Sequence, residues 1–200
     1  MIDQLHLPTT LQTRTGTINL RSATPHDLDA IIELLSDDAI SAGRGDLARD
    51  EDRGAYADAL RRITIDPCNE LLIATDPAGT VIGTLQLTLI LGMARRGSTR
   101  LLVEAVRVAN AHRSQGIGGA MMRWVVERAA ADTATHLVQL TSDNARADAH
   151  RFYRRFGFVD THIGFKYAIA PSAGVHNAGW KRDHHANQPR THRLRPQHPH

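Results

Sequence analysis

From residue 17 to residue 169 the sequence alternates between strand-like and helix-like segments, and this alternation restricts the fold more than any other feature. Runs rich in apolar and β-branched residues predict strands over residues 17–23, 70–75, 80–91, 99–109 and 136–141. Apolar residues at helical spacing predict helices over residues 25–36, 53–65, 116–131 and 145–156. Residues 158–169 are expected to add one or two closing strands. Helices interleaved with a mixed sheet predict an α+β or α/β domain with three layers.

The length of the chain sets the number of domains. Two hundred residues correspond to one domain, or to one domain with tails. We expect residues 1–15 to be a flexible N-terminal segment and residues 16–170 to form the domain, because no linker-like stretch interrupts them. Residues 171–200 hold five Lys/Arg against one acid, and almost no apolar side chains, which predicts a disordered Arg/His/Pro-rich tail. Three interpretations of this tail stay open: an arm for nucleic acid, a metal-binding histidine tract, or an incidental extension.

Cysteine, histidine and hydropathy patterns exclude several classes of protein. Cys68 is the one cysteine of the chain, so an intramolecular disulfide and a cysteine-cluster metal site are both excluded. No histidine pair has a convincing metal-ligand spacing, and we expect no metal. The longest apolar-leaning run, residues 81–94, is shorter than the ~18 residues that a membrane span needs. The first ten residues lack the features of a secretory signal, so we expect a cytoplasmic protein with no membrane partner.

The most informative ten residues are Arg113–Met122 (RSQGIGGAMM), which follow a predicted strand and open a predicted helix. Glycines at such a turn let the backbone approach a ligand, and the unpaired N–H groups of the first helical turn attract an anion such as pyrophosphate. The spacing Arg-x-x-Gly-x-Gly matches neither the dinucleotide-binding fingerprint nor the P-loop. Taken alone, the turn is equally compatible with a strand-to-helix connection that binds nothing.

Two further segments accompany this turn in a specific order. The strand-like run Leu101–Val108 (LLVEAVRV) precedes it, and Phe152–Phe158 (FYRRFGF) follows after another predicted strand. Together these segments resemble the GNAT superfamily of acyl-CoA-dependent N-acyltransferases, and nearly all the specificity of the resemblance lies in residues 101–158. The resemblance implies an α+β fold with three α/β/α layers, in which helices flank a mixed, mostly antiparallel sheet of about six or seven strands.

The resemblance also implies acetyl-CoA as the cosubstrate. The glycine-rich loop would cradle its pyrophosphate through residues that match the family pattern: Arg113, Gln115, Gly116, Gly118 and Gly119. The backbone of the preceding strand, from Val106 to Val108, would bond to the pantetheine arm and polarise the thioester carbonyl.

Acetyl transfer to an amine needs a group that accepts a proton. An amine with a pKa near 10.4 is almost wholly protonated at pH 7, so a general base would assist the reaction. Glu104 is the candidate, because it lies nine residues before Arg113, where many family members carry a carboxylate. On a regular strand it would share a face with Val106 and Val108. The alternative is a solvated or ion-paired strand glutamate.

The reaction also needs a proton for the departing thiolate. Tyr153 corresponds to the family's usual tyrosine acid, and a phenol with a pKa near 10 is protonated at pH 7. The alternative for Tyr153 is a core aromatic that packs beside Phe152 and Phe156. Arg146 stands seven residues earlier, where the family often has an asparagine, and its charge suits a CoA phosphate.

The acceptor is not identified by the sequence. The stretch from residue 37 to residue 52 is polar, contains several acids, and is predicted to be a mobile loop. In the family this region helps to form the acceptor wall. A carboxylate-rich rim suits a cationic amine, such as a polyamine, an aminoglycoside or a peptide lysine. An acidic loop that only faces solvent is the alternative.

These observations favour an N-acetyltransferase that moves an acetyl group from acetyl-CoA to a primary amine of a small molecule or peptide by direct attack. The alternative is a non-catalytic module that binds or senses acyl-CoA, which would keep the glycine-rich loop without needing Glu104 or Tyr153. A nucleic-acid binder is disfavoured because the sequence shows no recognition fold and no aromatic interleaving. A homodimer stays open.

Overall fold

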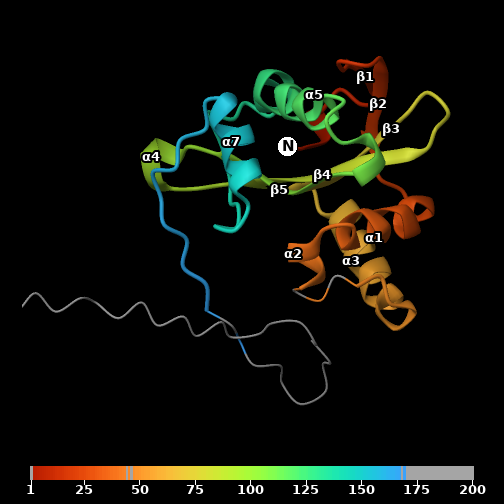
Figure 1. Ribbon diagram of the computed structural model, residues 1–200. Helices are drawn as coiled ribbons and strands as arrows, with labels where there is room; N and C mark the ends of the chain where they lie inside the picture. The colour runs from red at the N-terminus through yellow and green to blue at the C-terminus, as the bar shows by residue number, and fades with distance from the viewer. Residues whose placement is uncertain (1, 44, 46, 168, 170–200) are drawn as a thin grey trace, which may run out of the picture.

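The computed structural model describes residues 2–43, 45, 47–167 and 169. These residues form a six-stranded sheet in the order β1-β2-β3-β4-β5-β6, with helices on both faces (Figure 1). Each neighbouring pair is antiparallel except β5 and β6, which are parallel. The strands are β1 (Thr9–Gln12), β2 (Thr17–Ser22), β3 (Asn69–Thr75), β4 (Val81–Ile90), β5 (Arg100–Val108) and β6 (Leu137–Leu140). The predicted three-layer α+β fold is confirmed.

The helical segments match most of the predicted ranges. They are α1 (Leu28–Ser36), α2 (Ala39–Ala42), α3 (Arg53–Ile65), α4 (Ala94–Gly97), α5 (Ile117–Trp124), α6 (Ala130–Asp132) and α7 (Ala147–Arg155). Short 3-10 turns are η1 (Ile2–Gln4), η2 (Pro25–Asp27), η3 (Asp50–Asp52) and η4 (Asn110–His112), and a π-helical turn η5 (Val125–Ala129) joins α5 to α6. The helix predicted over residues 116–131 is therefore continuous but changes its hydrogen-bond pattern.

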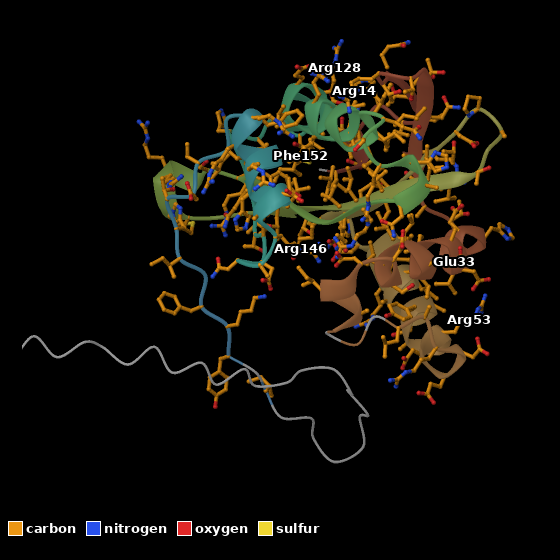
Figure 2. The ribbon with its side chains drawn as sticks, viewed as in Figure 1. Arg14, Glu33, Arg53, Arg128, Arg146 and Phe152 are labelled. Carbon is orange, nitrogen blue, oxygen red and sulfur yellow. The ribbon has the colours of Figure 1, made fainter. Side chains whose placement is uncertain are left out.

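Two apolar clusters hold the three layers together. On one face of the sheet, α5 and α7 pack over side chains such as Leu85, Leu87 and Leu101, and Phe152 points from α7 towards α5 (Figure 2). On the opposite face, α1 and α3 pack over a smaller cluster that contains Ile73 (Figure 1). We call these the α5–α7 face and the α1–α3 face.

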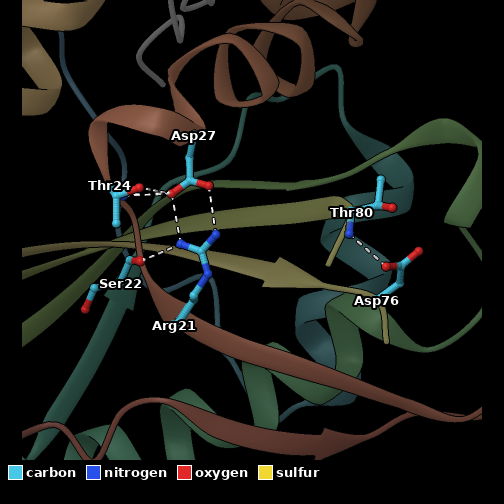
Figure 3. Close-up of polar contacts among 6 residues, drawn as sticks. All are labelled: Arg21, Ser22, Thr24, Asp27, Asp76 and Thr80. Carbon is cyan, nitrogen blue, oxygen red and sulfur yellow. Dashed lines mark hydrogen bonds and ion pairs between the residues drawn. The ribbon is translucent and has the colours of Figure 1, made fainter. Parts of the chain in front are cut away.

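The start of α1 is fixed by charge as well as by apolar packing. The Asp27 carboxylate accepts two hydrogen bonds from the Arg21 guanidinium, both at 2.8 Å, and one from the Thr24 N–H at 2.7 Å (Figure 3). Asp27 is 6% exposed. These contacts lower the pKa of Asp27 from 3.8 to about 2, chiefly through the Arg21 hydrogen bonds. A backbone N–H at the helix start and an arginine on β2 thus share one buried carboxylate.

The N-terminal segment corrects one prediction. Residues 1–15 were expected to lie outside the domain, whereas β1 pairs along β2, with Thr9 opposite Leu20. Ile2 is 3% exposed and belongs to the cluster of the α5–α7 face, against which Leu7 and Leu11 also pack. The apolar residues are too few to stand out in the sequence, but each has a buried place once β2 is present.

The segment after α7 corrects a second prediction. Residues 158–169 were expected to form one or two closing strands, and the described residues of this range contain none. Ile163, Phe165 and Tyr167 are more than four-fifths exposed. Among the described residues β6 pairs only with β5, so residues 158–167 add no strand to its other edge. The predicted tail, residues 171–200, lies outside the described residues.

The predicted loop over residues 37–52 is only partly irregular, because α2 and η3 form within it. No helix among the described residues is long and apolar enough to cross a membrane.

Candidate active site

The second half of β5 is an open strand edge. Residues Arg100–Val103 pair with Leu137–Leu140 of β6, and beyond Val103 no described strand pairs with β5 on that side. Residues 104–108 direct backbone N–H and C=O groups to this side. These groups therefore make no hydrogen bonds to a described neighbouring strand. Such an edge can bind an extended chain by β-type hydrogen bonds.

A β-bulge at Ala105 interrupts the same stretch. Gln86 lies opposite Glu104 and Thr84 lies opposite Arg107, so one residue of β4 faces two residues of β5. Ala105 has a φ of 50°, in the left-handed region that a residue with a side chain rarely adopts. The bulge shifts the alternation of side chains along β5 by one residue.

This shift corrects the predicted orientation of Glu104. Val103, before the bulge, and Val106 and Val108, after it, all pack on the α5–α7 face. Glu104 therefore does not share their face. It lies opposite Gln86, which lines a pocket on the α1–α3 face, and directly opposed residues of paired strands point to the same side. The exposed Glu104 carboxylate thus belongs to the α1–α3 face.

The glycine-rich loop leads into α5 as its motif predicted. Gly116 has a φ of 92° and is the residue just before the helix. The first hydrogen bond of the helix runs from the Ala120 N–H to the Gly116 carbonyl at 2.9 Å. The N–H groups of residues 117–119 therefore have no acceptor within the helix, and with the helix dipole they form a site suited to an anion.

Gly118 and Gly119 contribute through packing. A Cβ at Gly118 would lie 3.7 Å from Val108 Cγ2 and 3.8 Å from the Phe152 ring, and a Cβ at Gly119 would lie 3.8 Å from the Phe156 ring. These are ordinary contact distances. The two glycines let α5 lie close to α7 and β5, while the backbone conformation requires glycine only at Gly116.

Arg14, in the turn between β1 and β2, holds the loop from outside. Its N–H donates to the Gln115 carbonyl at 3.1 Å, and its guanidinium donates to the Ser114 carbonyl. A Cβ at Gly116 would lie 3.1 Å from both Arg14 N and Arg14 Cγ. The sequence analysis missed this residue, because nothing in the sequence near Arg14 indicates a contact with a loop one hundred positions away.

The polar side chains of the loop bond within the chain. Arg113 Nε donates to the Val108 carbonyl at 3.2 Å, and its Nη2 donates to the Asp37 carbonyl at 3.1 Å. Gln115 donates to the Ala111 carbonyl at 3.3 Å. Both residues therefore shape the connection between β5 and α5.

Two adjacent acidic residues after α1 connect the α1–α3 face to segments next to α5 and α7. The Asp37 carboxylate accepts hydrogen bonds from the backbone N–H of Asn110, at 2.9 Å, and from its side-chain amide. Asp38 pairs with both terminal nitrogens of the Arg146 guanidinium, and the two side chains are 17% and 20% exposed. Arg146 precedes α7 and lies at the end of that helix nearest α2 (Figure 2). The sequence predicted Arg146 as a residue for a CoA phosphate, and the structure gives it a carboxylate partner.

Tyr153 lies in an aromatic cluster on α7. Its ring contacts Phe152, with centroids 5.2 Å apart, and Phe158, with centroids 5.9 Å apart. Burial raises the pKa of its phenol above the ordinary value of 10.0, and the charges of Arg107 and Arg146 offset part of that rise. Tyr153 is thus a packed aromatic residue whose hydroxyl is protonated at neutral pH.

The structure separates the predicted site residues into two groups. The glycine-rich loop, Tyr153 and the Val106–Val108 stretch lie on the α5–α7 face or at the open edge, whereas Glu104 lies on the α1–α3 face. Among the described residues, no three side chains of histidine, cysteine, aspartate or glutamate gather as metal ligands would.

Comparison with known protein families identifies the family to which this arrangement belongs. The sequence model of the acetyltransferase (GNAT) family matches residues 28–158, a range that contains the open edge of β5, the glycine-rich loop and α7. The chain belongs to the GNAT family. It is an acetyl-CoA-dependent N-acetyltransferase, as the two sequence segments around the glycine-rich loop predicted.

Relatives of this GNAT chain are found among characterised proteins and solved structures. It is 28% identical over 151 residues to an aminoalkylphosphonate N-acetyltransferase of Salmonella typhimurium, a match that covers 75% of this chain and 90% of the relative. It is similar to the structure of a transcriptional regulator from Bacillus halodurans, with 36% identity, a TM-score of 0.71, and coverage of 76% and 99%. Glucosamine-6-phosphate N-acetyltransferase from Arabidopsis thaliana shares the fold, with 14% identity, a TM-score of 0.61, and coverage of 78% and 100%.

The residues of this GNAT site suit acetyl-CoA. The pantetheine arm carries amides that can pair with an open strand edge, and residues 104–108 provide one. The pyrophosphate carries negative charge, and residues 117–119 direct unpaired N–H groups to the start of α5. The donor set of the chain therefore matches the two parts of the cosubstrate that a protein backbone can recognise.

Proposed function

We propose that this enzyme acetylates the primary amine of a small molecule, with acetyl-CoA and the acceptor approaching β5 from opposite faces of the sheet. The observation that carries the proposal is the bulge at Ala105, which turns Glu104 to the α1–α3 face while Val106 and Val108 keep the other face. The name of the Salmonella relative supports a small acceptor, because an aminoalkylphosphonate is a short chain with a primary amine.

Acetyl-CoA supplies an activated acetyl thioester. In the proposed arrangement, backbone groups of Val106 and Val108 hold the pantetheine arm and polarise the carbonyl, and the N–H groups at Gly118 and Gly119 hold the pyrophosphate. Arg113 and Gln115 shape the loop around Gly116. The predicted contact of Arg146 with a CoA phosphate remains a prediction, and it would compete with the ion pair to Asp38.

The proton balance assigns one role to each candidate side chain. The amine nitrogen attacks the carbonyl carbon, a C–N bond forms, and the C–S bond breaks. Glu104, directly or through water, would take the proton that the amine loses, and the protonated Tyr153 would give one to the departing sulfur. Exchange with water then returns both residues to their starting states. The phenol of Tyr153, with its pKa above 10.0, carries at neutral pH the proton that this role requires.

Thiol release from acetyl-CoA tests the proposal. The panel contains aminoalkylphosphonates, simple alkylamines, polyamines, aminoglycosides and a lysine peptide, and each acceptor is measured with wild type, Tyr153→Phe and Tyr167→Phe. Tyr167 is 88% exposed and provides the matched control. We expect turnover of at least one small amine, a kcat at least ten-fold lower in Tyr153→Phe, and an unchanged Kd for acetyl-CoA.

Two results would contradict the proposal. Binding of acetyl-CoA without turnover of any acceptor on the panel would exclude a small-molecule acetyltransferase of this kind. Equal kcat values for Tyr153→Phe and Tyr167→Phe would exclude Tyr153 as the proton donor and leave it as a packing residue.

A further inference from the structure

A pocket of about 90 Å³ lies on the α1–α3 face, beside the bulge of β5. Its wall is mostly apolar, with Ile32 and Leu35 from α1, Ala59 and Ile63 from α3, and Ala105 at the bulge itself. We call it the α1–α3 pocket. Ala105 lines this pocket, and Glu104, the residue before it in the chain, belongs to the same face of the sheet.

Gln86 is a polar lining residue of the α1–α3 pocket, and a hydrogen-bond network holds its side chain. Gln86 Nε2 donates to Asn69 Oδ1 at 3.0 Å, and Asn69 is held in turn by Thr88, at 2.6 Å, and by Asp66, at 3.0 Å. This network fixes the Gln86 amide with its nitrogen towards Asn69, so its oxygen is directed elsewhere. Gln86 lines the pocket and Glu104 lies directly across the strands from it, so a carboxylate and an amide, two kinds of group that accept from the N–H groups of a primary amine, occupy neighbouring positions on this face.

The charges around the pocket do not favour a polycationic acceptor. Asp38 pairs with Arg146, Asp29 pairs with Arg53 at 2.8 Å, and Glu51 pairs with Arg49 at 3.3 Å. Acids that are paired within the chain leave a weaker net field than the acidic composition of residues 37–52 suggests. Glu104 therefore stands as a carboxylate beside the apolar wall of the pocket, on the same face of the sheet.

The volume of the pocket limits the size of the apolar group. An engineered cavity of ~150 Å³ binds benzene, and one water occupies ~30 Å³ of liquid. A pocket of about 90 Å³ is smaller than that cavity, and its volume suits a chain of roughly three or four carbon atoms.

We propose that the α1–α3 pocket binds the short aliphatic chain of a primary monoamine, whose nitrogen lies between Glu104 and Gln86 during acetyl transfer. This inference rests on the proposed function and specifies its substrate class. Each methylene that leaves water for the pocket should raise kcat/KM about four-fold until the pocket is full.

A series of linear amines from methylamine to hexylamine tests the inference, with spermidine and an aminoglycoside as comparison acceptors. We expect kcat/KM to rise to a maximum at propylamine or butylamine and to exceed that of both comparison acceptors. A flat series, or a preference for spermidine, would overturn the inference while the proposed function stands. No turnover of any of these acceptors or of the wider panel would overturn the proposed function itself.

Two variants with opposite effects on volume make the test specific to the pocket. Ala59→Leu fills the pocket and should move the optimum to an amine at least one carbon shorter, whereas Ile63→Ala enlarges it and should move the optimum to a longer amine. Ala55→Leu, at an exposed position of the same helix, is the matched control and should leave the optimum unchanged. The two variants should shift the optimal chain length in opposite directions. Loss of stability in either variant would not produce such a pair of opposite shifts. Unchanged optima in both variants would overturn the inference.

Discussion

The two faces of the sheet are built by different means. On the α5–α7 face and at the open edge of β5, the groups proposed to bind acetyl-CoA are backbone N–H and C=O groups. Gly116 positions those at the start of α5, and those of β5 are left open where its pairing with β6 ends. On the α1–α3 face and where it meets α7, the structure depends on residues from distant parts of the sequence: Arg146 pairs with Asp38, and Glu104 lies opposite Gln86 across the strands. Recognition through the backbone leaves a local sequence pattern, and recognition through distant side chains does not.

The largest expected effect is on catalysis, and it tests whether the α1–α3 face carries the general base. Glu104→Gln should lower kcat/KM for the amine about 100-fold at pH 7, because a positioned general base contributes at least that much. The defect should shrink as the pH approaches the pKa of the amine near 10, since the free amine no longer needs a base. The measurement is a pH–rate profile of both proteins with one alkylamine.

The comparison also requires that Glu104→Gln leave acetyl-CoA binding intact. Glu127→Gln, at an exposed position on the other face, is the matched control for the loss of one charge. A defect of equal size at all pH values would exclude the role as a base. A higher Kd for acetyl-CoA in Glu104→Gln would mean that Glu104 contributes to binding of the cosubstrate.

A second prediction concerns the stability of the α1–α3 face. The pKa of Asp27 is lowered to about 2, so its contribution is present above the ordinary pKa of 3.8 and is lost as the pH falls from about 4 towards 2. Asp27→Asn should therefore lower the free energy of unfolding at pH 7 by about 2 kcal/mol and flatten its decline between pH 4 and pH 2. Urea unfolding at several pH values measures both effects.

Glu33→Gln, at an exposed position of α1, is the control for that experiment and should change neither quantity. If Asp27→Asn unfolds with the same pH dependence as wild type, the Arg21–Asp27 contact does not anchor α1 in solution.

A third prediction tests the backbone side of the comparison. Gly116→Ala places a Cβ at a φ of 92° and 3.1 Å from Arg14 N, and a side chain in the left-handed region costs roughly 1–2 kcal/mol. The loop must shift to relieve this strain, so we expect the Kd for acetyl-CoA to rise about ten-fold, measured by calorimetry. Gly54→Ala has open space around the new Cβ and should leave the Kd unchanged. Equal Kd values for the two variants would remove the glycine-rich loop from the binding site.

The smallest expected effect lies at the contact that joins the faces. Asp38→Asn removes the charged partner of Arg146, which precedes the helix that carries Tyr153. We expect kcat to fall about three- to five-fold, in line with a partly buried ion pair, and Asp38→Glu to retain most of the activity. Tighter binding of acetyl-CoA by Asp38→Asn would instead show that the released Arg146 binds a CoA phosphate.

The sequence predicted β2 to β6, the four longer helices and the glycine-rich loop in their order, because periodicity and turn chemistry are local. It placed Glu104 on the wrong face, since a bulge that depends on pairing with β4 changes the alternation of side chains. It predicted one or two closing strands over residues 158–169, and the described residues of that range form none, because strand pairing depends on contacts that a local sequence pattern does not contain. Arg14 and Asp38 were missed as positioning residues, because their partners lie about one hundred positions away.

Hydrogen–deuterium exchange with and without acetyl-CoA tests most directly whether the cosubstrate occupies only one side of the sheet. The account predicts slower exchange in residues 104–108 and at the start of α5, with no change in α3. Slower exchange in α3, with β5 and α5 unchanged, would contradict it.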